Sequence, residues 1–182
     1  MGAMSLEEYV NHVSKVLDST KESAEIVSQL IHAKKALLST KNLIPERFQN
    51  GLDDLPYTRN LLHMDPEKRF VILSLVWRQN AETPAHDHCS WGVVGNYCGE
   101  MAMVDYELAD SELKPSSPVA LTEGHVVGIN PPRDHNIHKM LNVNNGITYT
   151  IHTYGDPGVA CRSFDVRTGR CEENEMVFHN QL

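Results

Sequence analysis

Two amphipathic patterns open the chain. Apolar residues recur at helical spacing from Leu6 to Leu17, and Ser5 with Glu8 forms a capping-box sequence, so a first helix should run to about Asp18. A second apolar stripe, over residues 26–38, predicts another helix that ends before the next proline. Each stripe occupies one face of its helix, so both helices should pack on a larger structure.

The pattern changes at Tyr57, after which short segments rich in β-branched and aromatic residues follow one another to the C-terminus. No long helical stripe lies between them. The segments expected to be strands are 57–64, 69–78, 91–97, 100–108, 119–122, 125–129, 136–143, 147–154, 161–165 and 174–178. Strands at this density predict a mainly β fold, a double-sheeted barrel with the helices packed at one end.

Composition narrows the class of protein. A chain of 182 residues, 41% hydrophobic and 22% charged, suits a single domain, with a helical cap at 5–50 and the barrel at 57–179. The net charge of −8 argues against nucleic acid or an anionic membrane as a partner. No apolar segment approaches the length of a bilayer span, and the first residues lack a secretory pattern, which favours a cytoplasmic protein.

The four cysteines form no recognisable framework. They show neither paired metal-ligand spacing nor the density of a disulfide scaffold. We therefore expect reduced thiols at all four positions, which are Cys89, Cys98, Cys161 and Cys171.

The candidate chemistry is centred on residues 84–88, just after an apolar run. Side chains at i and i+2 of a strand share a face, so His86 and His88 could reach one metal ion together. Asp87 would then face the other way and is better placed to hold a backbone group or a neighbour. Two polar side chains on the solvated face of an ordinary strand would give the same pattern.

Later histidines extend this candidate site, because barrels can hold a metal or small ligand among inward-facing residues. His138 could complete a three-imidazole site from the opposite wall. His152 could do the same, or it could lie beside the site. Thr150, His152 and Tyr154 share one face of their strand, where they could form a hydrogen-bonded row or simply face water. Periodicity alone leaves these alternatives open.

Taken together, these residues resemble a known family. The glycines around His86 and His88 resemble the first cupin motif, and the chain as a whole is similar to the cysteine dioxygenase family of thiol dioxygenases. The matching places are 57–61, 86–88, 138 with 142, 152–154, 164–169 and 178–179. The resemblance implies a cupin double-stranded β-helix, a jelly-roll-like barrel, with N-terminal helices. It also implies mononuclear non-haem Fe(2+) and oxidation of a small thiol to its sulfinic acid by O2.

The resemblance also implies roles for individual residues. The metal ligands would be His86, His88 and His138. Arg59 matches the arginine that binds the substrate carboxylate, and His152 with Tyr154 matches the catalytic pair beside the iron. We place three further residues in the substrate site, namely Tyr57, Trp77 and Arg162.

Several of these placements have alternatives. Arg162 could instead form a surface salt bridge. Trp77 and Trp91 could fill the barrel core, and Trp91 could wall the substrate pocket. His179 is most simply structural or solvated.

The sequence departs from the family pattern in two places. Thr150 stands where the family usually has serine, which keeps a hydroxyl. Where animal members carry a cysteine crosslinked to the tyrosine, this chain has Gly92 and Val93, so no thioether to Tyr154 is expected. The segment 88–95 looks more like the related mercaptopropionate dioxygenases.

The chemistry of the candidate metal ligands also favours a centre that binds a thiol. No carboxylate follows the His-x-His before Glu100, so three neutral imidazoles would hold the metal. A divalent ion so ligated keeps its full charge and favours a thiolate as an added ligand. Iron is preferred over zinc because open positions on a facial set of imidazoles suit oxygen chemistry.

We therefore expect a cysteine dioxygenase that acts as a monomer on L-cysteine and O2 and yields cysteine sulfinic acid. Arg59 discriminates within the family, because the mercaptopropionate branch has glutamine in its place. The alternatives are a 3-mercaptopropionate dioxygenase, a zinc- or nickel-holding cupin without oxygen chemistry, and a non-catalytic barrel.

Overall fold

The computed structural model describes residues 2–109, 112–157 and 161–181. Its helical elements are α1 (Leu6–Ser19), α2 (Ser23–Leu38) and the short η1 (Glu46–Phe48) and η2 (Arg133–His135). Its strands are β1 (Tyr57–Met64), β2 (Phe70–Trp77), β3 (Ala85–His86), β4 (Gly92–Cys98), β5 (Met101–Ala109), β6 (Glu112–Pro115), β7 (Val119–Leu121), β8 (Val126–Ile129), β9 (His138–Asn142), β10 (Thr148–Gly155), β11 (Cys161–Phe164), β12 (Cys171–Asn174) and β13 (Asn180–Gln181).

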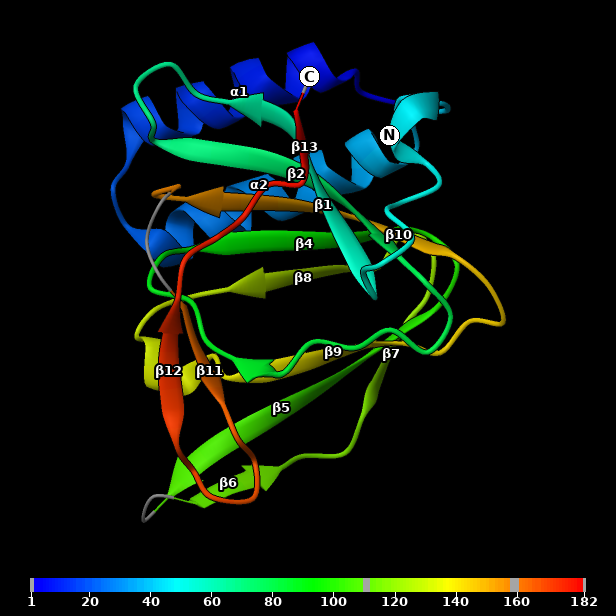
Figure 1. Cartoon of the computed structure of the whole chain (residues 1–182). Coiled ribbons are helices and arrows are strands. Elements are labelled where there is room, and N and C mark those ends of the chain that lie inside the picture. The colour runs from blue at the N-terminus through cyan, green and yellow to red at the C-terminus, as the bar shows by residue number, and fades with distance from the viewer. Residues whose placement is uncertain (1, 110–111, 158–160, 182) are drawn as a thin grey trace.

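The strands form two sheets that face each other (Figure 1). One sheet has the order β13-β1-β2-β10-β4-β8, and the other has the order β12-β11-β3-β9-β5-β6 with β7 paired to β5. Neighbouring strands pair in antiparallel fashion, apart from β13, which lies parallel to β1. The predicted cupin-type barrel with N-terminal helices is therefore confirmed.

Both long helices cover the outer face of the first sheet (Figure 1). The predicted capping box is present: the Glu8 amide donates to the Ser5 hydroxyl at 3.2 Å, and the Ser5 amide donates to the Glu8 carboxylate at 2.8 Å. Tyr9 and Leu30 are fully buried against the sheet. Burial of each such side chain contributes on the order of 1.5–3 kcal/mol, so packing holds the helices in place.

Strand β2 is the central wall of the barrel. All its positions are buried, because one face packs on the helices and the other lines the space between the sheets. This explains why residues 70–77 read as an almost continuous apolar run. Neither long helix of the described chain has the length and apolar character needed to cross a bilayer.

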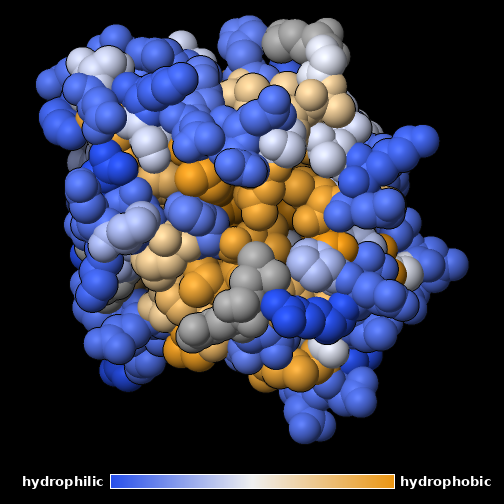
Figure 2. All heavy atoms as spheres, turned by 90° about the horizontal axis from the view of Figure 1, so that it is seen from above, coloured by the Kyte–Doolittle hydropathy of each residue, from blue (hydrophilic) through white to orange (hydrophobic). Residues whose placement is uncertain are grey.

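The molecular face at the top of Figure 1 is hollowed. Hydrophobic side chains line this hollow and hydrophilic side chains surround it (Figure 2).

The C-terminal strands differ from the prediction. A strand was expected at 174–178, but β12 ends at Asn174, and β13 then pairs with β1. The intervening residues run from one sheet to the other, so they cannot join a ladder (Figure 1). The exposed β6 was missed, because Leu113 is its single buried residue and gives no alternation.

Candidate metal centre

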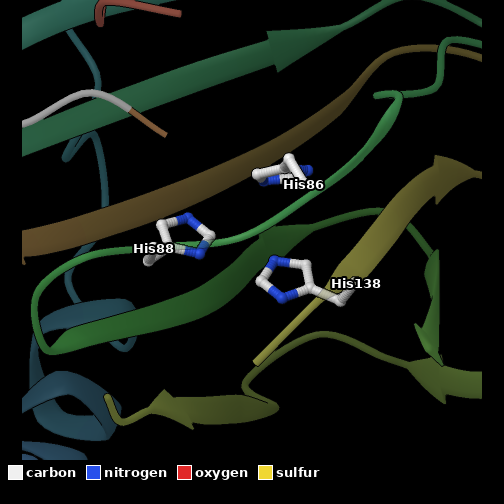
Figure 3. A group of neighbouring side chains, drawn as sticks. All are labelled: His86, His88 and His138. Atoms are coloured by element: carbon white, nitrogen blue, oxygen red, sulfur yellow. The ribbon is translucent and has the colours of Figure 1, made fainter. Parts of the chain in front are cut away.

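Three imidazoles converge between the sheets (Figure 3). His86 lies on β3, His88 follows two residues later, and His138 begins β9, where it is the register partner of His86. Their nearest ligand atoms all lie within 4.8 Å of one another. The ring centroid of His86 is 4.7 Å from that of His138 and 5.0 Å from that of His88. The structure thus brings the three predicted ligands to one place.

Backbone carbonyls orient two of the rings. Nδ1 of His86 lies 3.0 Å from the Pro84 oxygen, and Nδ1 of His138 lies 3.0 Å from the Asn136 oxygen. A ring nitrogen that faces a carbonyl must carry the hydrogen, so Nε2 of each ring is left as a lone-pair donor. Nδ1 of His88 is buried without a hydrogen-bond partner in the described structure. Buried polar atoms normally have a partner, so this set of nitrogens fits a metal ion.

The site keeps its imidazoles uncharged. Burial is the main cause that lowers the pKa of His86 to about 3 and that of His138 to about 4. Burial also holds the pKa of His88 well below its ordinary value. Neutral imidazole is the form that coordinates a metal, so these rings need no deprotonation near neutral pH.

Asp87 faces away from the three rings, as predicted. It is fully buried and accepts two hydrogen bonds from the Arg133 guanidinium at 3.0 Å, together with the Arg162 amide at 2.7 Å and Arg162 Nε at 2.5 Å. Burial acts to raise the pKa of Asp87, but the hydrogen bonds from the two arginines outweigh it and hold the pKa below its ordinary value. The carboxylate therefore locks the segment between the two histidines.

The placement of Arg162 in the substrate site is corrected. Its guanidinium pairs with Asp87 and Asp134 instead. The reason is strand alternation: the preceding Cys161 lines the cavity, so residue 162 points to the opposite face of β11. The salt bridge that the sequence left open is the role that the structure gives to Arg162.

A cavity opens beside the three histidines and is walled by both sheets. The predicted residues that line it are Tyr57, Arg59, Trp77, His152 and Tyr154, together with the histidines themselves. Trp91 does not wall this cavity. It packs in the core beneath the helices, where its ring covers Gly155 so closely that a Cβ there would lie 2.4 Å from the indole nitrogen.

Arg59 brings a positive charge to the cavity. Its Nη2 donates to the Tyr57 hydroxyl at 3.2 Å, and its guanidinium lies 5.0 Å from the centre of the Tyr57 ring. Among the residues that the structure describes, no carboxylate lies within ion-pair distance of Arg59. A guanidinium with no counter-ion inside a cavity is suited to an anionic ligand.

The row of polar side chains on β10 is hydrogen-bonded, as the sequence allowed. Trp77 Nε1 donates to Thr150 Oγ1 at 2.8 Å, which lies 2.7 Å from His152 Nε2. His152 Nδ1 lies 2.6 Å from the Tyr154 hydroxyl. The indole can only donate, and the Thr150 hydroxyl, which has two acceptor lone pairs and one hydrogen, can either donate to His152 Nε2 or accept from it. With the His152 hydrogen on Nδ1, that hydrogen goes to the Tyr154 oxygen and the Tyr154 hydrogen is left for the cavity. With the hydrogen on Nε2, the Tyr154 hydroxyl donates to Nδ1.

Gly92 lets the Tyr154 ring lie against β4. The two residues are register partners, and a Cβ at position 92 would lie 2.7 Å from the Tyr154 ring. Gly92 therefore offers no sulfur for a thioether to Tyr154. Burial raises the pKa of Tyr154, which keeps its phenol protonated.

Sequence reasoning missed Asn136, which contacts the backbone of His88. His179, expected to be structural or solvated, contacts the backbone of Arg59. Both contacts join segments far apart in the chain. The one available signal for Asn136 was its place two residues before a candidate ligand.

The fold and site define a three-histidine centre in a cupin-type barrel. No family model matches the chain. Two curated relatives are cysteine dioxygenase type 1 from Danio rerio, 27% identical over 137 residues, and from Homo sapiens, 26% identical over 135 residues. The matches cover 69% and 71% of this chain but only 64% and 66% of the relatives, which is less than two thirds of their length. The resemblance to the cysteine dioxygenase family is thereby confirmed.

Solved structures with a similar fold include a cupin domain and an oxalate oxidase. One is the Cupin_2 domain of an XRE family transcriptional regulator from Enterobacter cloacae, with a TM-score of 0.42 and 16% identity, covering 57% of this chain and 99% of that one. Another is oxalate oxidase in complex with the substrate analogue glycolate, with a TM-score of 0.45 and 16% identity, covering 65% of this chain and 54% of that one.

Proposed function

We propose that this chain is an iron-dependent thiol dioxygenase that oxidises L-cysteine to cysteine sulfinic acid. The observation that carries the proposal is the placement of Arg59, a cation without a carboxylate partner among the described residues, in the same cavity as three convergent neutral imidazoles. The similarity to cysteine dioxygenases supports the reaction type.

His86, His88 and His138 would hold the ion. A three-nitrogen set with no carboxylate leaves open positions and a full positive charge, which favours a thiolate. Ferrous iron at this place would supply the redox chemistry that activates dioxygen. The chain's contribution is to keep the three rings neutral and aimed at one point.

Arg59 would bind the substrate carboxylate. The planar guanidinium offers two parallel N–H donors, and a charge-assisted hydrogen bond contributes about 1.5–3 kcal/mol. The Tyr57 hydroxyl accepts one hydrogen of this guanidinium and the Tyr57 ring lies beside it, so the fork has a defined orientation before substrate arrives. A small thiol whose carboxylate carbon is three bonds from its sulfur, such as L-cysteine, would then bridge Arg59 and the ion held by the imidazoles.

Tyr154 would act as a hydrogen-bond donor to the substrate or to oxygen. This role places the His152 hydrogen on Nδ1, so that the row from Trp77 through Thr150 and His152 donates to the Tyr154 oxygen and leaves the Tyr154 hydrogen facing the cavity. Apolar side chains of Leu75 and Met140 line the same space and limit the entry of water.

Oxygen consumption tests the proposal. The iron-loaded protein is given L-cysteine, 3-mercaptopropionate and cysteamine side by side. We expect fastest uptake with L-cysteine and slow uptake with cysteamine, which has no carboxylate for Arg59. Fastest uptake with 3-mercaptopropionate would support the second candidate, which the segment 88–95 favours. Stoichiometric zinc in the isolated protein and no oxygen uptake with any thiol would refute both.

A further inference from the structure

We propose that Asn136 is a positioning residue that holds two of the three imidazoles and thereby sets the affinity of the centre for its metal. The inference rests on the metal-binding part of the proposed function. Its basis is that the side chain of Asn136 fixes the backbone of His88, while its backbone carbonyl orients the ring of His138.

The first contact has two points. Oδ1 of Asn136 accepts the His88 amide hydrogen at 2.8 Å, and Nδ2 donates to the His88 carbonyl at 3.0 Å. One side chain thus satisfies both backbone groups of a buried ligand, as a neighbouring strand would. His88 lies just beyond the end of β3, so no ladder partner performs this task. The side-chain amide of Asn136 thus takes the place of a ladder partner for His88.

The second contact comes from the backbone of the same residue. The Asn136 carbonyl lies 3.0 Å from Nδ1 of His138 and keeps the hydrogen on that nitrogen. Such a partner fixes the tautomer and the orientation of a metal-binding imidazole. Any movement of Asn136 would therefore reach His88 through its side chain and His138 through its carbonyl.

The turn around Asn136 is itself anchored. Nδ2 of Asn136 is also within reach of the carbonyls of Asn130, at 3.0 Å, and Pro132, at 3.3 Å. Arg133, at the start of the same turn, forms the two-point pair with buried Asp87, between the first two histidines. The turn at 133–136 therefore binds the segment 86–88 at two successive residues, Asp87 and His88.

This arrangement preorganises the centre. The rings are oriented when the chain folds, so less ordering is required when the ion binds. Loss of the Asn136 side-chain contacts should weaken metal binding and speed metal dissociation, even in a variant that still folds. A residue that served stability alone would lower the free energy of unfolding without a specific effect on the metal.

The test compares Asn136→Ala with Asn142→Ala. Asn142 is a matched control, because its buried amide donates to three backbone carbonyls and accepts a backbone amide, at the far end of β9 from His138. The Fe(II) dissociation constant of each variant is measured anaerobically by competition with a chromophoric chelator. Urea unfolding of the metal-free proteins measures the free energy of unfolding.

We expect Asn136→Ala to raise the dissociation constant about 10- to 100-fold, the usual effect of losing an outer partner of a metal ligand. Asn142→Ala should lower the free energy of unfolding but leave the dissociation constant unchanged. If Asn136→Ala does not fold, Asn136→Ser, which keeps one short hydrogen-bonding group, should give a smaller increase in the same direction.

An unchanged dissociation constant in the Asn136 variant, or equal increases in both variants, would overturn the inference. Failure of the proposed oxidation is distinguishable from this outcome. Iron binding that follows the expected order without oxygen uptake would refute the dioxygenase but support the role of Asn136. A wild-type chain that binds no Fe(II) would overturn both.

Discussion

Arg59 and His179 exchange two hydrogen bonds, although they lie far apart in the chain. The Arg59 amide donates to Nδ1 of His179 at 2.9 Å, and the His179 amide donates to the Arg59 carbonyl at 2.9 Å. Burial is the main cause that lowers the pKa of His179, so Nδ1 remains a neutral acceptor. The C-terminal segment therefore fixes the backbone from which Arg59 reaches into the cavity.

We predict that His179→Ala raises the KM for L-cysteine several-fold, because loss of one such hydrogen bond costs about 0.5–1.5 kcal/mol. The Fe(II) dissociation constant should not change. Exposed His125 provides the control variant His125→Ala. Steady-state oxygen uptake measures both; equal KM values for the two variants would show that the C-terminal contact does not position Arg59.

Arg59→Gln should lower kcat/KM for L-cysteine about 10- to 100-fold, since it removes a charge-assisted pair of about 1.5–3 kcal/mol. Metal affinity should survive, because Arg59 contacts none of the three histidines through a hydrogen bond in the described structure. Oxygen uptake and chelator competition measure the two effects separately. Parallel loss of activity and metal would count against a carboxylate-binding role.

Thr150→Val tests the hydrogen-bonded row on β10. The substitution removes a buried hydroxyl and leaves Trp77 Nε1 and His152 Nε2 without their partner, at a cost of about 1–3 kcal/mol for each unsatisfied group. We expect a lower kcat and a lower free energy of unfolding. Thr150→Ser, which keeps the hydroxyl, is the matched control and should behave like the wild type. A Val variant with the kcat of the Ser variant would refute the row's role.

The buried side chain of Lys34 should make the free energy of unfolding depend on pH, and this effect needs no metal. The Lys34 side chain is fully buried, and its Nζ donates to Thr153 Oγ1 at 2.6 Å. Burial lowers its pKa well below the ordinary value of 10.5. As pH falls below 10.5, the unfolded chain takes up a proton at Lys34 that the folded chain does not, so the wild type loses stability.

The stability of the wild type relative to Lys34→Met should therefore rise with pH, by up to about 1.4 kcal/mol per unit, and level off above the ordinary pKa. Urea unfolding at several pH values measures the difference, and exposed Lys35 provides the control Lys35→Met. A difference that is independent of pH would mean that Lys34 is protonated in the folded protein.

The sequence predicted those features that are encoded locally. The capping box at Ser5 depends on residues close in the chain, so spacing alone revealed it. Spacing also put Thr150, His152 and Tyr154 on one face of β10, but it left open whether they bond to one another or face water. The barrel pattern offered both His138 and His152 as a third imidazole, and the family resemblance chose His138. Local spacing could not show that Asn136 completes the pairing of His88, since that contact depends on how two segments meet in three dimensions.

Alternation also explains the correction at Arg162. Arg162 has the chemistry of a substrate site, but it points to the face of β11 opposite the cavity. Its orientation follows from the register of β11 with β3, which is a long-range pairing. A shift of one residue in that register would have reversed the outcome.

The most direct measurement is isotope incorporation from labelled dioxygen. The iron-loaded protein is incubated with L-cysteine under labelled O2, and the product is analysed by mass spectrometry. The account predicts cysteine sulfinic acid in which both added oxygen atoms carry the label. Product with unlabelled oxygen, or cystine as the sole product, would contradict the assignment of a thiol dioxygenase.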